Sequence, residues 1–308
     1  MRAPQVRFHD TKGAALIRIA VVGRRDVGQY ERAVERLSDV TIVAGVERFL
    51  PEHRGKCDAV IVDAALESQS ALATQAAKAG KHVLVTTPMA QTIEDADALI
   101  ASCEAVGVRL MVGGERRFLP AVEEIRKRLN AGLLGVPGLL RMHRWEPKEK
   151  PRAGASLDEI DLACWLFDSI PTHVYATSRE GDSGCYLQVH FGFPNGGMAL
   201  IDFACTLKEG KGYFSLSLIG SSGAAYADDH HNTHLLFGGG DPKALVSDQQ
   251  RGCLTAQIEE LGRAIREDRQ PVITGEDGRS VLLVRDAVEE SISSGRAVEQ
   301  TGGIYASV

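Results

Sequence analysis

Short apolar runs alternate with amphipathic stretches between residues 17 and 112. The first run, Ile17–Val22, holds five apolar residues among six and leads straight into a glycine turn. This alternation is typical of a parallel sheet with helices on its faces. We expect strands at residues 17–22, 41–46, 59–62, 82–85 and 108–112. The best-marked helix follows Thr92, which has capping-box spacing to Asp95, and its end is marked by Gly107.

The pattern changes after Gly113, where one more amphipathic helix is expected at residues 120–130. Turn-forming residues then separate β-rich runs at residues 138–145, 172–178, 185–193, 197–204 and 213–220, which is typical of an antiparallel sheet. Late helices are expected at residues 255–267 and 279–294. The sequence thus predicts an α/β protein: a Rossmann-like parallel-sheet domain over residues 1–118, then an α+β domain with a mostly antiparallel open sheet over residues 119–308.

The glycine turn after the first strand carries part of a dinucleotide-binding motif. In G-x-G-x-x-G the first glycine forms the turn, the second lets the pyrophosphate approach, and the third lets helix and strand pack. Gly23 and Gly28 occupy the first and third positions, whereas Arg25 occupies the second. The guanidinium of Arg25 either pairs with a phosphate or fills the crevice, and the motif leaves both alternatives open. The candidate cofactor contacts here are Gly23, Arg25, Val27 and Gly28.

An acidic residue, Glu47, ends the second strand about twenty residues after this turn, where an acid binds the ribose hydroxyls in NAD sites. Its neighbour Arg48 either contacts the adenine or a 2′-phosphate, or is an ordinary surface arginine. Only ten residues separate Glu47 from Asp58, whereas a parallel crossover needs about a dozen. We therefore expect a shortened segment between residues 47 and 58 and a thinner or open adenine side.

Composition narrows the classes of partner. The chain is 44% hydrophobic and 25% charged, as in ordinary globular proteins, and its net charge of −6 argues against a nucleic-acid partner. No apolar run is long enough for a membrane span, and the N-terminus lacks a hydrophobic signal core. Six cysteines are scattered singly, which predicts reduced, mostly buried thiols and a cytoplasmic location. A small-molecule ligand fits these properties best.

Three motifs carry a resemblance to a known family. The segment A-A-K-A-G-K-H-V-L-V-T-T-P at residues 76–88, G-G-E-R-R-F at residues 113–118, and Asp161 with W-L-F at residues 165–167 resemble motifs of the Gfo/Idh/MocA family of NAD(P)-dependent sugar and polyol oxidoreductases. The G-E-D-G segment at residues 275–278 is similar to the start of the family's last helix. The resemblance covers nearly all of residues 17–298. It implies NAD or NADP as cofactor, contacts from Ala64, Thr86, Thr87 and Pro88, and self-association as a homodimer or homotetramer through the C-terminal sheet.

The resemblance fails at the family's usual catalytic positions. The family lysine falls on Thr87, the aspartate and histidine of its helix motif fall on Gly154 and Asp158, and an asparagine falls on Glu115. A threonine cannot transfer a proton at neutral pH, whereas Asp158 can if burial raises its pKa. In the other interpretation, Asp158 and Glu159 only place negative charge at a helix N-terminus. The candidate catalytic residues are Asp158 and Glu115.

Other polar clusters have plainer interpretations. The cluster at residues 228–234 holds three histidines, but a solvated turn is favoured over a metal site, and we expect no metal. The basic segment at residues 144–152 either binds an acidic substrate or is a mobile surface segment. His143 and His190 fit core or interface positions, and His173 a structural one at a strand start.

Two functions follow from the sequence as hypotheses. The first is an NAD(P)-dependent oxidoreductase with an atypical active site that acts on a small sugar-like or acidic ligand. The second is a catalytically silent relative that acts as a ligand sensor, scaffold or partner subunit.

Overall fold

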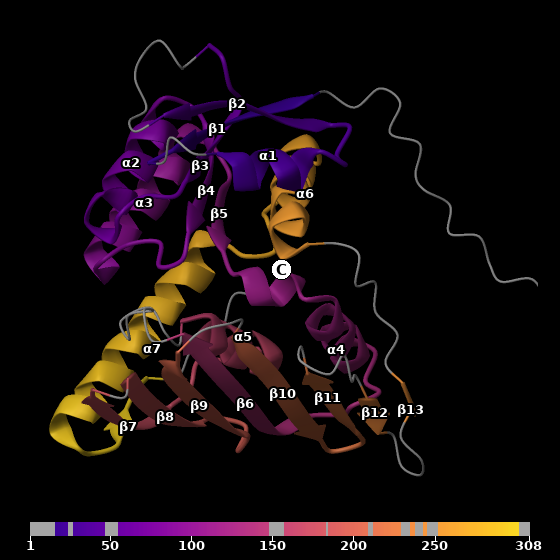
Figure 1. Cartoon of the computed structure of the whole chain (residues 1–308), viewed down its shortest axis with the longest axis vertical. Coiled ribbons are helices and arrows are strands. Elements are labelled where there is room, and N and C mark those ends of the chain that lie inside the picture. The colour runs from indigo at the N-terminus through magenta and orange to yellow at the C-terminus, as the bar shows by residue number, and fades with distance from the viewer. Residues whose placement is uncertain are drawn as a thin grey trace, which may run out of the picture.

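Two sheets, one above the other, organise the molecule, with helices around the first and along one face of the second (Figure 1). The computed structural model describes residues 16–23, 27–46, 55–147, 157–182, 184–208, 212–228, 235–237, 243–244 and 252–301. None of the helices in these ranges is long and apolar enough to cross a membrane.

The first sheet has five parallel strands in the order β2-β1-β3-β4-β5. Its strands are β1 (Ile17–Val22), β2 (Val40–Val46), β3 (Ala59–Val62), β4 (His82–Thr86) and β5 (Leu110–Gly113). All four residues of β3 are fully buried, because helices cover both faces of a parallel sheet. The helices that follow β1, β3 and β4 are α1 (Gly28–Val34), α2 (Leu66–Lys78) and α3 (Ile93–Val106).

Helix α3 is capped at both ends by the residues that the sequence predicted, Thr92 and Gly107. The Thr92 hydroxyl accepts a hydrogen bond from the backbone N–H of Asp95 at 3.2 Å, which satisfies one of the free donors at the start of the helix. Gly107 ends the helix in the left-handed conformation, with φ of 69°, that a residue without a Cβ adopts most easily.

Within the described residues, the second sheet has nine strands in the order β13-β12-β11-β10-β6-β9-β8-β7-β14. Its strands are β6 (Pro137–Pro147), β7 (His173–Gly181), β8 (Gly184–Gly192), β9 (Met198–Leu207), β10 (Tyr213–Gly220), β11 (Ala224–Asp228), β12 (Leu235–Phe237), β13 (Lys243–Ala244) and β14 (Val298–Glu299). Neighbouring strands are antiparallel except β6 and β9, which run parallel. The expected fold class, a Rossmann-like sheet followed by a mostly antiparallel one, is confirmed.

One face of the second sheet is covered by helices α4 (Pro120–Asn130), α5 (Leu157–Phe167) and α7 (Gly275–Ser294), and the other face is open (Figure 1). Strand β8 shows the division, because Leu187, Val189 and Phe191 are buried while the residues between them are exposed. This alternation places every second side chain of a strand in the core.

The C-terminal helices join the two sheets. Helix α6 (Cys253–Arg266) packs against α1 and β2, and its Ile258 and Leu261 belong to the core of the first sheet. The first turns of α7 lie against the same sheet, since a Cβ at Gly278 would lie 2.8 Å from Val112. Between the sheets the chain passes from β5 through a one-turn 3-10 helix, η2 (Glu115–Phe118), to α4. The domain boundary expected at residue 118 falls at the end of η2 and stays a prediction.

One expectation about the cysteines is wrong. Cys185 and Cys205 form a disulfide, because strands β8 and β9 place them directly opposite each other with Cα atoms 5.1 Å apart. Their separation of 20 residues gives no hint of this register. Cys57, Cys103 and Cys164 are free and buried, as expected, and Cys253 is free and partly buried. The cytoplasmic location was inferred from reduced thiols, so the disulfide weakens that argument and the location stays a prediction.

Candidate functional site

The turn after β1 abuts the end of β3. Gly23 has φ of 99°, and a Cβ on it would lie 2.5 Å from the Cβ of Ala64 and 2.6 Å from the carbonyl oxygen of Asp63. Only glycine therefore fits at this position. The Gly23 N–H donates to the Val46 carbonyl at 2.8 Å, and the Asp63 carboxylate accepts from the Tyr30 hydroxyl at 2.6 Å. These bonds fix the turn at the carboxyl ends of β1, β2 and β3, where α/β sheets bind ligands.

The expected cofactor residues divide into two groups. Val27 caps α1 and Gly28 is its first helical residue, so both lie at this turn with Gly23 and Ala64. Arg25, Glu47 and Arg48 lie outside the described residues, as does Gly154.

The end of β4 is held by a residue that the sequence analysis missed, Gln69 of α2. This glutamine is buried, and its Nε2 donates to the carbonyl oxygen of Thr86 at 2.6 Å and to that of Pro88. Its Oε1 accepts from the Thr86 hydroxyl at 3.0 Å. The one signal in the sequence is a polar residue on the α2 face that otherwise buries only alanines, at positions 73, 76 and 77.

Thr87 is engaged in the backbone of the neighbouring strand. Its hydroxyl donates to the carbonyl oxygen of Gly113 at the end of β5, and the bond between Thr87 and Pro88 is cis. Thr87, Pro88 and Gly114 line a small cavity with Leu157, the first residue of α5. The structure thus brings the position after β4 and the start of α5 to one place.

A bidentate ion pair anchors η2 to α5. The Nε and Nη2 atoms of Arg117 each donate to a carboxylate oxygen of Asp161 at 2.7 Å, and Nη1 donates to the Val272 carbonyl at 2.9 Å. Both side chains are almost fully buried. Since its oxygens are held in this pair, Asp161 serves to position η2 against α5.

Beside this pair lies a second cluster of charges, formed by Arg116, Arg144, Glu146 and Glu159. The Glu159 carboxylate is fully buried and lies 2.8 Å from Nε of Arg116 and 3.2 Å from Nη1 of Arg144. Nε of Arg144 donates to Glu146 at 2.7 Å. Such buried charges persist because each one faces an opposite charge. The Arg144 side chain is therefore buried in ion pairs inside the protein. Residues 145–147 of the basic segment complete β6, and residues 148–152 lie outside the described residues.

Asp158 stands at the edge of this cluster. Its Oδ2 lies 3.9 Å from Nε of Arg116, and a quarter of its side chain is exposed. Burial, together with the neighbouring charge of Glu159, raises the pKa of Asp158 to about 7, against the opposing effect of Arg116. A carboxyl group with this pKa gives and takes protons at neutral pH. Glu115, the other candidate, is exposed and takes part in none of the ion pairs found for this cluster in the described ranges.

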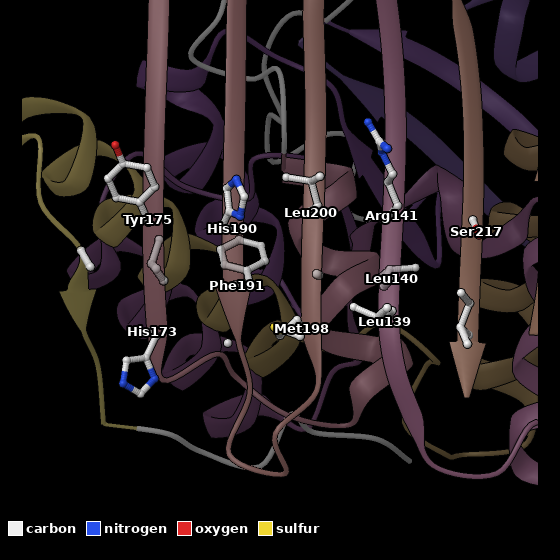
Figure 2. A pocket seen from close by; sticks show the side chains of 15 residues that line it. Leu139, Leu140, Arg141, His173, Tyr175, His190, Phe191, Met198, Leu200 and Ser217 are labelled. Atoms are coloured by element: carbon white, nitrogen blue, oxygen red, sulfur yellow. The ribbon is translucent and has the colours of Figure 1, made fainter. Parts of the chain in front are cut away.

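The open face of the second sheet carries two shallow hollows. The first, of about 510 Å³, is lined by Leu139, Tyr175, His190 and Met198 among others, whose side chains stand up from β6 to β9 (Figure 2). The second, of about 640 Å³, includes Asp202, which accepts from Arg141 at 2.9 Å and from Gln188 at 2.7 Å.

The histidines expected at core or interface positions lie on this open face. His143 lies 3.6 Å from Asp202, and His190 points outward in Figure 2. A core position is thus wrong for both, because each falls on the outward-facing half of the strand alternation.

The described residues hold no cluster of three potential metal ligands. Of the polar segment at residues 228–234, only Asp228 is described, and its carboxylate accepts from the hydroxyls of Tyr213 at 2.9 Å and Tyr226 at 2.8 Å.

Comparison with known proteins identifies the relatives of the chain. Residues 6–114 match the family described as "Oxidoreductase family, NAD-binding Rossmann fold". The chain is 24% identical to myo-inositol 2-dehydrogenase of Thermotoga maritima over 295 residues, which covers 86% of this chain and 88% of the relative.

Two solved structures share the whole fold. The aldose-aldose oxidoreductase of Caulobacter crescentus, complexed with glycerol, superposes with a TM-score of 0.79 at 21% identity, over 92% of this chain and all of the other. An oxidoreductase of Agrobacterium radiobacter in complex with NAD+, L-tartaric acid and magnesium superposes with a TM-score of 0.80 at 16% identity, over 92% of this chain and 98% of the other.

Proposed function

Because this chain belongs to the Gfo/Idh/MocA family of NAD-binding oxidoreductases, we propose that it oxidises or reduces a small sugar-like or acidic ligand with Asp158 as the proton donor and acceptor. The family membership confirms the resemblance found in the sequence and the expectation of a nicotinamide cofactor. The proposal concerns what is particular to this chain: the ligand, the choice of NAD or NADP, and an active site without the family's lysine and histidine.

The turn after β1 supports a dinucleotide site at this edge of the sheet. Gly23 leaves no room for a Cβ beside Ala64, so the backbone at the carboxyl end of β1 packs directly against the end of β3. Residues that would hold the cofactor are Gly23, Val27, Gly28, Ala64 and the segment from Thr86 to Pro88. Arg25, Glu47 and Arg48 remain candidates for its phosphates and adenosine. When bound, the nicotinamide ring supplies or accepts the hydride, and the protein has to move the proton.

The observation that carries the proposal is the contrast among the carboxylates and hydroxyls around the start of α5. Thr87 donates its hydroxyl to Gly113, and Asp161 is held by Arg117 in a bidentate pair. Glu159 is fully buried between two arginines. Asp158 alone among these groups combines partial exposure with a pKa of about 7. It therefore combines access to solvent with a pKa near neutral pH, as a general acid and base requires.

The test begins with fluorescence titrations of the full chain with NADH and with NADPH, followed by turnover assays on inositols, aldoses and 2-hydroxy acids. We expect saturable binding of at least one cofactor. Asp158→Asn is expected to keep cofactor binding and to lose turnover by about 100-fold or more, the usual contribution of general acid–base catalysis. Glu115→Gln is the matched comparison and is expected to keep turnover. A loss with Glu115→Gln and none with Asp158→Asn would overturn the assignment.

The second hypothesis, a catalytically silent relative, has one observation in its favour. Thr87 stands at the position of the family lysine, and its hydroxyl donates a hydrogen bond to the Gly113 carbonyl instead of to a ligand. Under this hypothesis neither cofactor binds saturably at millimolar concentration. The same titration therefore separates a ligand sensor, scaffold or partner subunit from an enzyme.

We further propose that the chain forms a homodimer or homotetramer through the open face of its second sheet. Large apolar side chains stand on this face, among them Met198, with 54% of its surface exposed, and Leu139, with 48% (Figure 2). Contiguous apolar surface of this kind is typical of interfaces between subunits. The strands place polar groups such as Arg141 and Asp202 beside it, as in interfaces that combine an apolar centre with polar partners.

A further inference from the structure

The charges around Asp158 are not balanced. Arg116 and Arg144 carry two positive charges, and Glu146 and Glu159 carry two negative charges, all four within one group of ion pairs. Asp158 is the fifth member, at the exposed edge of the group. Counted over these five described residues alone, the formal charges cancel when Asp158 is protonated and leave one net negative charge when it loses its proton.

Arg116 is fixed by contacts on several sides. Its Nε lies 2.8 Å from Glu159, and the guanidinium carbon lies 4.2 Å from the centre of the Phe214 ring, a cation–π distance. Only 15% of its side chain is exposed. The next residue, Arg117, anchors η2 to Asp161, so the backbone of Arg116 is held as well. The arginine therefore keeps its charge at one place when a neighbouring group changes its protonation state.

Four charged groups on three elements act on Asp158. Glu159 and Asp161, from α5 itself, disfavour its ionised form, and Arg116 from η2 and Arg144 from β6 favour it. Asp161 is matched by Arg117, and Arg144 is shared between Glu146 and Glu159. Arg116 is the cation whose Nε stands 3.9 Å from the Asp158 carboxylate. At such a distance two charges interact strongly when they are shielded from water.

We propose that Arg116 is a positioning residue for proton transfer: held by Glu159 and Phe214, it stabilises the carboxylate that Asp158 forms when it gives its proton to the ligand. This inference rests on the proposed function. In the reducing direction, a bound nicotinamide cofactor would supply the hydride to the carbonyl carbon of the ligand, and Asp158 gives its proton to the carbonyl oxygen and becomes a carboxylate facing Arg116. Water at the exposed edge of Asp158 returns the proton. In the oxidising direction, Asp158 takes the hydroxyl proton and releases it to water.

The inference is tested without cofactor by titrating the Asp158 carboxyl carbon in the full chain by ¹³C NMR. Arg116→Gln is expected to raise the titration midpoint by about one pH unit, since a stabilising cation is lost. Glu159→Gln is expected to lower it by about as much, since a repelling anion is lost. Arg128→Gln, on the exposed face of α4 where Arg128 pairs with Glu124, is the control and should leave the midpoint unchanged.

Arg116→Lys separates charge from shape and serves where Arg116→Gln does not fold. It keeps the cation and is expected to keep the midpoint near that of the unaltered chain. A midpoint that does not move with Arg116→Gln, or that moves with Arg116→Lys as far as with Arg116→Gln, would overturn the inference. If only Glu159→Gln folds, a midpoint that stays or rises would overturn it.

Turnover distinguishes a failure of this inference from a failure of the proposed function. If the chain turns over a ligand and the pH dependence of kcat does not shift with Arg116→Gln, the function stands and the role of Arg116 is wrong. If the NMR midpoints shift as expected but no cofactor binds, the proposed function is wrong and the role of Arg116 in proton transfer falls with it.

Discussion

Asp158 and Glu159 are neighbours on the first turn of α5, yet they lie in opposite environments. The Glu159 carboxylate is fully buried, with Arg116 at 2.8 Å and Arg144 at 3.2 Å. The Asp158 side chain is a quarter exposed, and its Oδ2 lies 3.9 Å from Nε of Arg116. Successive residues of a helix point about 100° apart, so one carboxylate enters the ionic cluster while the other lies at its exposed edge. The division of roles between them follows from this geometry.

The raised pKa of Asp158 predicts a pH-dependent stability. Its value is 3.8 in an ordinary setting and about 7 in the folded chain, so between these values the folded state binds more protons than the unfolded state. The contribution of Asp158 to stability is therefore fully present below about pH 4 and is lost as the pH rises to about 7. Asp158→Asn is expected to be more stable than the unaltered chain at pH 8 and to differ little from it at pH 4. Urea denaturation at both values measures this, and an equal difference at both would contradict it.

Gly23 is expected to be essential to the cofactor crevice. Gly23→Ala places a Cβ 2.5 Å from that of Ala64 at a positive φ, so it should destabilise the chain by about 3 kcal/mol and abolish NADH binding. Gly80→Ala is the matched control, because Gly80 has a φ of 73° but nothing within 4 Å of the added Cβ. It should cost only about 1 kcal/mol and leave NADH binding intact. Equal effects of the two substitutions would show that close packing at Gly23 does not matter.

The disulfide is expected to contribute to stability. It closes a loop between residues separated by 20 positions, and constraining a loop of this length in the unfolded chain is worth about 3 kcal/mol. Thermal unfolding with and without dithiothreitol should therefore differ, and the variant with both Cys185→Ala and Cys205→Ala should not respond to the reductant. If dithiothreitol still lowers the unfolding temperature of this variant, the effect does not come from the disulfide between Cys185 and Cys205.

If the chain self-associates through the open sheet face, a charged substitution on that face should break the oligomer, whereas one elsewhere on the surface should not. Met198→Glu introduces an unpaired carboxylate into the apolar hollow shown in Figure 2 and is expected to yield monomers in sedimentation velocity experiments. Val106→Glu, at a comparably exposed apolar side chain at the end of α3, should leave the oligomer unchanged. A monomer in the unaltered chain at micromolar concentration would contradict the proposal.

The fold was predicted well where one local pattern decides the structure. The strand at 59–62 and the helix at 120–130 have the expected bounds, and Thr92 and Gly107 cap α3 as their chemistry predicts. Helix α7 begins at Gly275, four residues before the bound expected from the hydrophobic pattern, because Thr274 and Asp277 form a capping box. The G-E-D-G segment at residues 275–278, which resembles the start of the family's last helix, marks this beginning.

The site was predicted only in part, because much of it depends on register and tertiary contact. The sequence singled out Asp158 and its dependence on burial, but the partners that set its environment come from η2 and β6, 42 and 14 residues earlier in the chain. The pairing of Cys185 with Cys205 depends on the register of β8 and β9, which no local signal specifies. Gln69 contacts the end of β4 only because α2 folds back over the sheet.

The pH dependence of kcat for turnover with NADH or NADPH, measured for the unaltered chain and for Asp158→Asn, shows whether Asp158 carries the proton step. We expect a single ionisation near pH 7 in the unaltered chain, in line with the pKa of Asp158, and a flat, much lower profile in the variant. A variant that keeps both the rate and the ionisation near pH 7 would contradict the assignment of the proton step to Asp158.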